Sequence, residues 1–90
     1  MAIGLIFEVP GVTQEQYDAV SQQMDAGGPM EGCLMHVAGP MEGGWRVIEV
    51  WASQEAADTF FRERLQTVLG QVGIPPIEPK VFPVHNFFKS

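Results

Sequence analysis

A histidine and a glutamate on two neighbouring strand-like segments are the first candidates for chemistry in this 90-residue sequence. His36 lies in residues 33–39 (CLMHVAG), and Glu49 lies in residues 45–52 (WRVIEVWA). A hairpin that turns at Glu42-Gly43 would place the two side chains directly opposite each other, with Cβ atoms about 4.5–5.5 Å apart. The carboxylate would then orient the imidazole ring and favour its protonated form. Such a pair is typical of a general base that acts on an acidic C–H or O–H group.

Aromatic residues near this pair predict a site for a flat, apolar ligand. Trp45 and Trp51 share the strand parity of Glu49, so these side chains are expected on one face of the strand. Tyr17 would bring a phenol to the same region if a pocket opens between the helices and the sheet. The same hairpin register sets Leu34 opposite Trp51. The alternative interpretation is that the histidine and glutamate form a structural pair and that the aromatic side chains belong to the core.

The C-terminal segment holds a second group of polar candidates. Residues 81–88 (VFPVHNFF) predict a last strand, in which Pro83 indicates a sheet edge or a bulge. His85 and Asn86 point to opposite faces of such a strand, so only one of them can line a given cavity. The alternative is that they are satisfied polar groups near the strand end or at a dimer rim. Arg46 could bind an anionic group, or it could project to solvent or pair at an interface.

Several classes of ligand and partner are not expected. No His, Cys and carboxylate residues have the spacing of a zinc or iron site, and the glycine-rich turns lack a nucleotide-binding motif, so we expect no metal and no cofactor. The 5 basic and 11 acidic residues, with a net charge of −6, argue against nucleic acid and anionic membrane surfaces. No apolar run is long enough to span a bilayer, and Met1 is not followed by a basic region. With Cys33 as the single cysteine, a cytoplasmic location is expected.

The order of the predicted elements indicates one domain over residues 1–90. Strands are expected at residues 2–9, 33–39, 45–52 and 81–88. Helices are expected from Gln14 to the Gly27-Gly28-Pro29 stop, and from a Ser53 cap to about residue 69 or 71. This order, β-α-β-β-α-β, predicts a ferredoxin-like α+β fold with an antiparallel sheet in the order 4-1-3-2. Right-handed crossovers would place both helices on one face of the sheet.

Both predicted helices have recognisable caps or apolar stripes. Thr13 and Gln16 have the spacing of a capping box. In the first helix the apolar stripe consists of Tyr17, Val20 and Met24. In the second helix it consists of Ala57, Phe61, Leu65, Val68 and Val72.

The sheet face away from the helices would have no cover within the chain. Apolar residues occupy both parities of the strands at residues 2–9 and 45–52. A bare four-stranded apolar face is larger than the patch of a few hundred Å² that soluble monomers usually expose. We therefore expect a homodimer that forms through this face of the sheet.

Four segments carry a resemblance to a known group of proteins. They are residues 43–47 (GGWRV), residues 49–56 (EVWASQEA), Phe60-Phe61 with Leu65, and residues 83–86 (PVHN). Over nearly its full length the chain resembles the dimeric α+β barrel superfamily and its antibiotic biosynthesis monooxygenase group, most closely a set of small bacterial proteins of this fold. The resemblance implies a homodimer of ferredoxin-like subunits.

The resemblance implies a different site in each branch of the superfamily. In the cofactor-free aromatic monooxygenases it implies an Asn, a Trp and an Arg around a polyketide, and in the haem-degrading branch an Asn, a Trp and a His. Residues 4–8 (GLIFE) have no Asn at the place where those enzymes commonly carry one. Asn86 lies on the last predicted strand and cannot simply take that role.

Two functions are consistent with these features. The first is a small cofactor-independent enzyme, a monooxygenase, isomerase or cyclase, that acts on a hydrophobic, aromatic or polyketide-like metabolite. The second is a non-catalytic dimeric protein that binds a small molecule or assists another protein. A closed, solvent-reachable pocket of about 300 Å³ or more that contains His36 or His85 would favour the first. A sheet packed solidly on both faces would favour the second.

Overall fold

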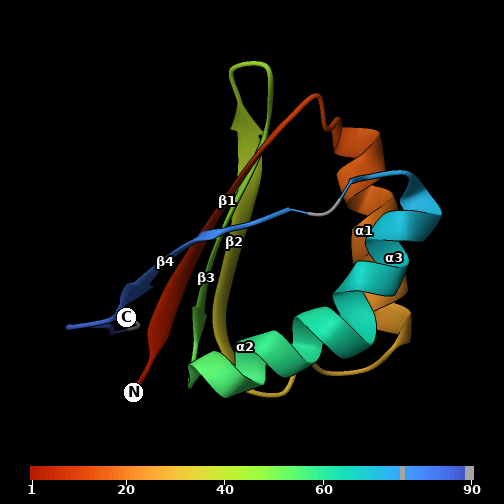
Figure 1. Ribbon diagram of the computed structural model, residues 1–90. Coiled ribbons are helices and arrows are strands. Elements are labelled where there is room, and N and C mark those ends of the chain that lie inside the picture. The colour runs from red at the N-terminus through yellow and green to blue at the C-terminus, as the bar shows by residue number, and fades with distance from the viewer. Residues whose placement is uncertain (76, 89–90) are drawn as a thin grey trace.

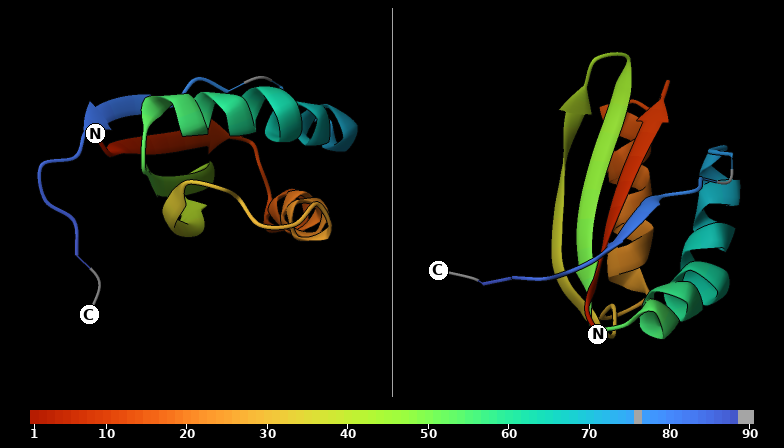
Figure 2. Two further views of the ribbon diagram at one scale, coloured as in Figure 1. Left: turned by 90° about the horizontal axis from the view of Figure 1, so that it is seen from below. Right: turned by 60° about the vertical axis from the view of Figure 1, so that its left-hand side comes forward.

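A four-stranded antiparallel sheet with helices on one face forms the architecture of the chain (Figure 1). The computed structural model describes residues 1–75 and 77–88. The elements are β1 (Ile3–Pro10), α1 (Gln14–Ala26), β2 (Cys33–Met41), β3 (Gly44–Trp51), α2 (Gln54–Phe60), the π-helical turn η1 (Phe61–Leu65), α3 (Gln66–Val72) and β4 (Lys80–Pro83). The sheet order β2-β3-β1-β4 is the predicted order read from the other edge. The predicted ferredoxin-like fold is therefore confirmed, and Figure 2 shows α1 and the α2–η1–α3 helix as two separate rods on the same side.

The capping box predicted at the start of α1 is present. The Gln16 N–H donates to the Thr13 hydroxyl at 3.2 Å, and the Thr13 N–H donates to the Gln16 side-chain oxygen at 3.0 Å. These two bonds satisfy backbone donors that a helix start leaves without partners. No residue of α1 is fully buried. The apolar stripe of α1 therefore does not pack tightly onto the sheet.

The hairpin of β2 and β3 has the predicted register around its centre. His36 is paired with Glu49, and Gly39 is paired with Arg46. The prediction that Leu34 faces Trp51 is wrong, because a bulge between residues 33 and 35 sets Cys33 opposite Trp51 and leaves Leu34 without a partner in the ladder. A bulge inserts one extra residue into one strand, and hairpin symmetry alone does not reveal it.

The core lies between the sheet and the α2–η1–α3 helix. Its buried residues are Ile3, Leu5, Phe7, Trp51, Ala57 and Phe60. The sequence pattern placed Phe61 on the inner stripe, but the structure buries Phe60 there and leaves Phe61 half-buried. In η1 the Gln66 N–H bonds to the Phe61 carbonyl, five residues back. This π-type bond departs from the regular helix on which the prediction was based.

The last strand is shorter than predicted. β4 covers only Lys80–Pro83, and one further bond joins the Val84 N–H to the Ala2 carbonyl at 3.0 Å. Since β4 runs antiparallel to β1 and Pro83 faces Ile3, the residues that follow have passed the end of β1. Within residues 1–75 and 77–88, no strand pairs with residues 85–88. The predicted sheet edge at Pro83 is confirmed.

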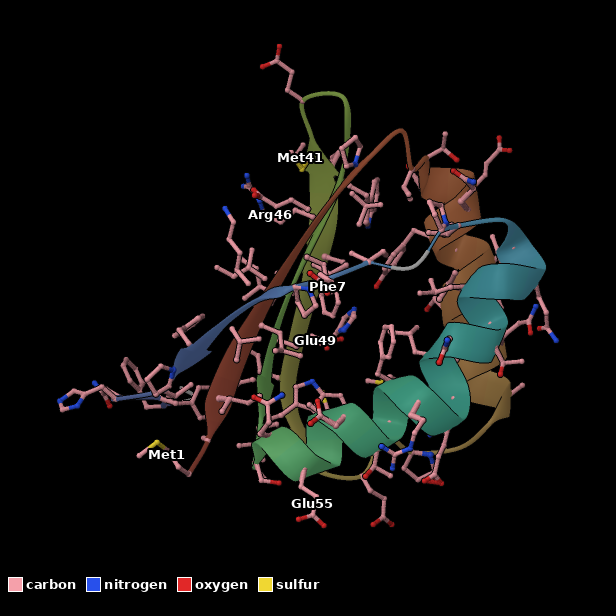
Figure 3. All side chains as sticks on the ribbon, in the orientation of Figure 1. Met1, Phe7, Met41, Arg46, Glu49 and Glu55 are labelled. Carbon is pink, nitrogen blue, oxygen red and sulfur yellow. The ribbon has the colours of Figure 1, made fainter. Side chains whose placement is uncertain are left out.

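The sheet surface that faces away from the helices is called the outer face here. Its side chains include Ile6, Glu8, Val37, Arg46, Ile48 and Phe82. Val37 and Phe82 are 53% and 42% exposed. Arg46 donates to the Glu8 carboxylate at 2.7 Å and holds the pKa of that carboxyl below its usual value. Figure 3 shows Arg46 on this face and Phe7 on the helix side.

Within residues 1–75 and 77–88, no helix combines the length and apolar character that crossing a bilayer requires.

The close approach of β1 to β3 gives a first testable prediction. A Cβ at Gly44 would collide with the Val9 carbonyl oxygen and would lie 2.9 Å from Pro10 Cα, whereas a Cβ at Gly39 would meet no atom within 4 Å. We expect Gly44→Ala to lower the free energy of unfolding by about 1–3 kcal/mol. Gly39→Ala, the matched control, should be neutral or stabilise by up to about 1 kcal/mol. Urea unfolding measures both, and equal stability of the two variants would contradict the prediction.

Candidate functional site

A cavity of about 390 Å³ lies between α1, the sheet and the α2–η1–α3 helix. Its lining residues are Phe7, Val9, Val12, Tyr17, Val20, Ser21, Met24, Asp25, Gly28, Pro29, Met30, His36, Trp45, Val47, Glu49, Phe60, Leu65, Leu69, Ile74 and Ile77. The lining is mainly apolar, with a few polar side chains that converge from α1 and the β2–β3 hairpin. This volume and composition are typical of a site for a small organic ligand. The apolar stripe of α1 therefore lines this space.

A chain of hydrogen bonds links four side chains at one wall of the cavity. The Tyr17 hydroxyl lies 2.7 Å from His36 Nε2, and His36 Nδ1 lies 2.8 Å from Glu49 Oε2. The indole N–H of Trp51 donates to the other carboxylate oxygen, Glu49 Oε1, at 2.9 Å. The register of β2 and β3 places the histidine and glutamate opposite each other, while α1 supplies the tyrosine. The structure thus brings together Tyr17, His36, Trp45 and Glu49 around one cavity.

The Glu49 carboxylate determines which ring nitrogen of His36 carries the proton. Its side chain is only 8% exposed, and a buried carboxylate is tolerated when hydrogen-bond donors reach both oxygens. As an ionised carboxylate can only accept, His36 must carry a proton on Nδ1. In the neutral imidazole, Nε2 is then the basic nitrogen and accepts from the Tyr17 hydroxyl. The basic nitrogen of His36 is therefore the one on the Tyr17 side of the ring.

The environment of Tyr17 keeps its phenol protonated. Burial, and then the nearby carboxylates of Glu49, Asp18 and Asp25, raise the pKa of Tyr17 above its usual value of 10.0. The ring also stacks on Trp45, with ring centroids 5.3 Å apart. This packing holds the hydroxyl in position as a neutral donor.

The two tryptophans occupy different positions. Trp45 lines the cavity, and its indole nitrogen is the one buried side-chain polar atom among the described residues that has no hydrogen-bond partner. Trp51 is 1% exposed and lies outside the lining of this cavity. It acts on the site through the hydrogen bond from its indole to Glu49, a positioning contact that strand parity does not reveal.

Three polar residues considered in the sequence lie away from this cavity. His85 and Asn86 follow β4, are exposed and do not belong to the lining. Arg46 projects from the outer face, where it pairs with Glu8. Within one chain, these residues are therefore not brought to His36 and Glu49.

Sequence reasoning missed one wall of the cavity. Gly28, Pro29 and Met30, which were recognised only as a helix stop, belong to the lining. Arg64 of η1 holds this segment by donating to the carbonyls of Pro29 at 2.7 Å and Gly28 at 2.9 Å. No periodic pattern connects an arginine on the second helix with a loop more than thirty residues earlier, so only the tertiary structure reveals this contact.

Two other kinds of chemistry find no support in the described part of the chain. Residues 1–75 and 77–88 contain no group of three or more His, Cys, Asp or Glu side chains that could hold a metal ion. Burial, and then the Glu49 carboxylate, raise the pKa of the Cys33 thiol. A raised pKa disfavours the nucleophilic thiolate.

Solved structures similar to this chain come from a common fold group. Comparisons of the sequence with protein-family models and with curated proteins found no match. A protein from Chloroflexus aurantiacus J-10-fl, provisionally described as an antibiotic biosynthesis monooxygenase, is 24% identical, with a TM-score of 0.67 over 98% of each chain. SnoaB, a cofactor-independent oxygenase from Streptomyces nogalater, is 14% identical, with a TM-score of 0.63 over 99% of this chain and 96% of its own. A conserved protein from Methanosarcina mazei Go1 is 15% identical, with a TM-score of 0.68 over 91% of each chain.

These similarities establish the fold class. The chain has the ferredoxin-like α+β fold of the antibiotic biosynthesis monooxygenase-like proteins over nearly its whole length, as the resemblance in sequence implied. At these identities the similarity concerns the fold, and a fold hosts many different activities. A specific function must therefore be argued from the cavity and its side chains.

The position of Tyr17 leads to a pH prediction. Because it is the only tyrosine in the sequence, the phenolate absorbance reports this residue alone, and we expect a midpoint above 10.0 in the folded protein. Glu49→Gln should move the midpoint down, because one cause of the raised pKa is removed, whereas Glu55→Gln on the exposed start of α2 should not. Because folding raises the pKa of Tyr17, the protonated phenol contributes to the stability of the folded state. This contribution is complete below pH 10 and is lost as the pH rises through the folded-state pKa. A midpoint at or below that of the urea-unfolded chain would contradict the prediction.

Proposed function

We propose that this protein is a small cofactor-independent enzyme that begins its reaction by removing a proton from a hydrophobic, aromatic metabolite. The observation that carries the proposal is the chain of hydrogen bonds from Tyr17 through His36 to Glu49 at the wall of an apolar cavity of about 390 Å³. The volume exceeds the lower bound of about 300 Å³ expected for a ligand site. His36, Glu49 and Tyr17 are the proposed catalytic group.

The geometry supports distinct roles for the three side chains. His36 Nε2 would accept the proton of an acidic C–H or O–H group, and Glu49 would stabilise the resulting imidazolium through its bond to Nδ1. Once Nε2 carries a proton, it can no longer accept from Tyr17. The Tyr17 hydroxyl would then be free to donate to the substrate oxygen on which negative charge develops. Trp45 and the apolar residues would hold the flat rings of the substrate.

Three outcomes are open to the carbanion or enolate formed in this step. With molecular oxygen as the oxidant, an activated CH₂ group becomes a carbonyl, and the second oxygen atom leaves as water, which makes the protein a monooxygenase. Without oxygen, return of the proton from His36 to another carbon makes it an isomerase, and attack of the carbanion on a carbonyl of the same molecule makes it a cyclase. All three begin with the same proton transfer.

The catalytic proposal predicts a strong effect of small substitutions at the site. Anthrone has an acidic CH₂ group and an apolar three-ring frame, so it serves as a probe that O₂ converts to anthraquinone and water. We expect His36→Gln and Glu49→Gln to lower the rate of this conversion by about 10²- to 10⁴-fold, the usual contribution of a general base. Glu55→Gln, the control for Glu49→Gln, should retain the wild-type rate. Oxygen consumption and quinone absorbance measure the reaction.

Turnover that is unchanged in His36→Gln would remove the histidine from the catalytic role. The alternative function, a non-catalytic binding protein, is favoured by one observation: His36 Nε2 already has a hydrogen-bond partner in Tyr17. A raised melting temperature with hydroxylated aromatic ligands, together with no conversion of anthrone above the uncatalysed rate, would support that alternative.

We also propose that the functional unit is a homodimer formed through the outer face. Ile6, Ile48, Val37 and Phe82 form an apolar surface there, and the helices lie on the opposite side (Figure 1). Burying this surface against a second copy would remove apolar area from water. The net charge of −6 would oppose association only weakly at physiological salt.

A charge at Val37 tests the dimer. The residue is 53% exposed in the single chain, so the fold should tolerate Val37→Lys, but a buried interface should not. We expect the wild-type protein to sediment as two chains at micromolar concentration, and Val37→Lys to sediment mainly as one. Gln22→Lys adds the same charge to the exposed side of α1 and should remain dimeric. A well-folded wild-type monomer at that concentration would overturn the proposal.

A further inference from the structure

A second cavity adjoins the first and shares one wall with it. It has a volume of about 440 Å³ and lies between β1, β3, α2 and the segment before β4. The residues common to both linings are Phe7, Glu49, Phe60, Leu65 and Ile77. The Glu49 carboxylate therefore stands at the boundary of the two spaces, and the hydrogen-bonded His36 lines the first of them.

We propose that Phe60, supported by Leu65, is the specificity-determining partition that limits the length of the ligand beside His36. This inference rests on the proposed function for the aromatic class of the ligand. A cavity of about 390 Å³ lies near the lower end of the range of about 300–1,000 Å³ found for ligand sites, and the two spaces joined would lie in its upper part. A frame that fits the first cavity must meet the Phe60 ring if it is lengthened by one more ring toward the second.

Two of the other shared residues, Phe7 and Glu49, are less suited to this role. Phe7 belongs to β1, an inner strand of the sheet that both cavities share as a wall. Glu49 is held by hydrogen bonds to His36 and Trp51. Phe60, by contrast, comes from the helix layer and lines both cavities from that side.

The position of Phe60 is held by its neighbours. Its ring packs against Trp51 with centroids 5.2 Å apart, and the Arg64 guanidinium lies 5.2 Å from the ring centroid. Arg64 is itself anchored on the Met24 and Gly28 carbonyls at 2.9 Å. These contacts fix the ring between the helix and the sheet.

The π-helical turn explains why Phe60 and Leu65 act together. In a regular α-helix two residues five positions apart point about 140° away from each other. The turn η1 contains the bond from the Gln66 N–H to the Phe61 carbonyl, which spans five residues. A wider turn brings residues five apart onto nearly the same side, and both Phe60 and Leu65 line both cavities.

The experiment compares two ligands that differ by one ring. Hydroxyanthraquinone has three rings and hydroxynaphthacenequinone has four, and both carry a hydroxyl beside a quinone carbonyl. Dissociation constants are measured by calorimetry for the wild-type protein, Phe60→Ala and Phe60→Leu. We expect the wild-type protein to bind the three-ring ligand more tightly than the four-ring ligand. In Phe60→Ala, the ratio of the two dissociation constants should shift toward the four-ring ligand by about tenfold or more, as for other changes of hydrophobic pocket size.

Phe60→Leu keeps most of the buried volume, so it decides the question if Phe60→Ala does not fold, and its expected shift is smaller in the same direction. Val68→Ala is the control, because Val68 is buried on α3 but lines neither cavity. It should leave the ratio unchanged. The same ratio in the wild-type protein and in the folded Phe60 variants, with binding retained, overturns the partition and leaves the proposed function standing. Absence of binding of both ligands to all variants overturns both proposals, whereas loss of turnover alone bears only on the catalytic proposal.

Discussion

The buried carboxylate of Glu49 is the interaction on which the rest of the site depends. A carboxylate in this position is stable only because donors from two directions reach its oxygens: His36 across the hairpin and Trp51 along the same strand. These bonds fix the tautomer of the histidine and join the sheet, the core and the cavity into one unit. A shift of one residue in the register of β2 and β3 would turn His36 to the other face and leave the carboxylate short of a donor.

The helix layer shows how the fold keeps space next to this group. α2 packs Ala57 and Phe60 into the core, while α1 has no fully buried residue and borders the cavity with its apolar stripe. Space between packed elements forfeits dispersion contacts, and a chain of 90 residues has little apolar surface to bury in compensation. Bound ligand would restore those contacts, so the layout favours binding over tight packing.

The sequence predicted well where the pattern was local. The capping box at Thr13, the element order and the pairing of His36 with Glu49 depend on short-range spacing and on one tight turn, and all three are confirmed. The errors have a common origin. The bulge that displaces Leu34 and the π turn that follows Phe60 each change the local register by one residue, and such changes have no clear signal in apolar periodicity.

The sequence by itself therefore determined the ferredoxin-like order of elements, the apolar stripe of α1 and the hairpin that opposes an imidazole and a carboxylate, because each follows from propensity and from side-chain period. Tertiary structure decided the rest. It brought Tyr17 within 2.7 Å of His36, turned Trp51 from an expected ligand wall into a donor to Glu49, and left His85 and Asn86 beyond the end of β4. Distances between side chains on different elements depend on how the helices lie on the sheet, and no spacing within one segment specifies that placement.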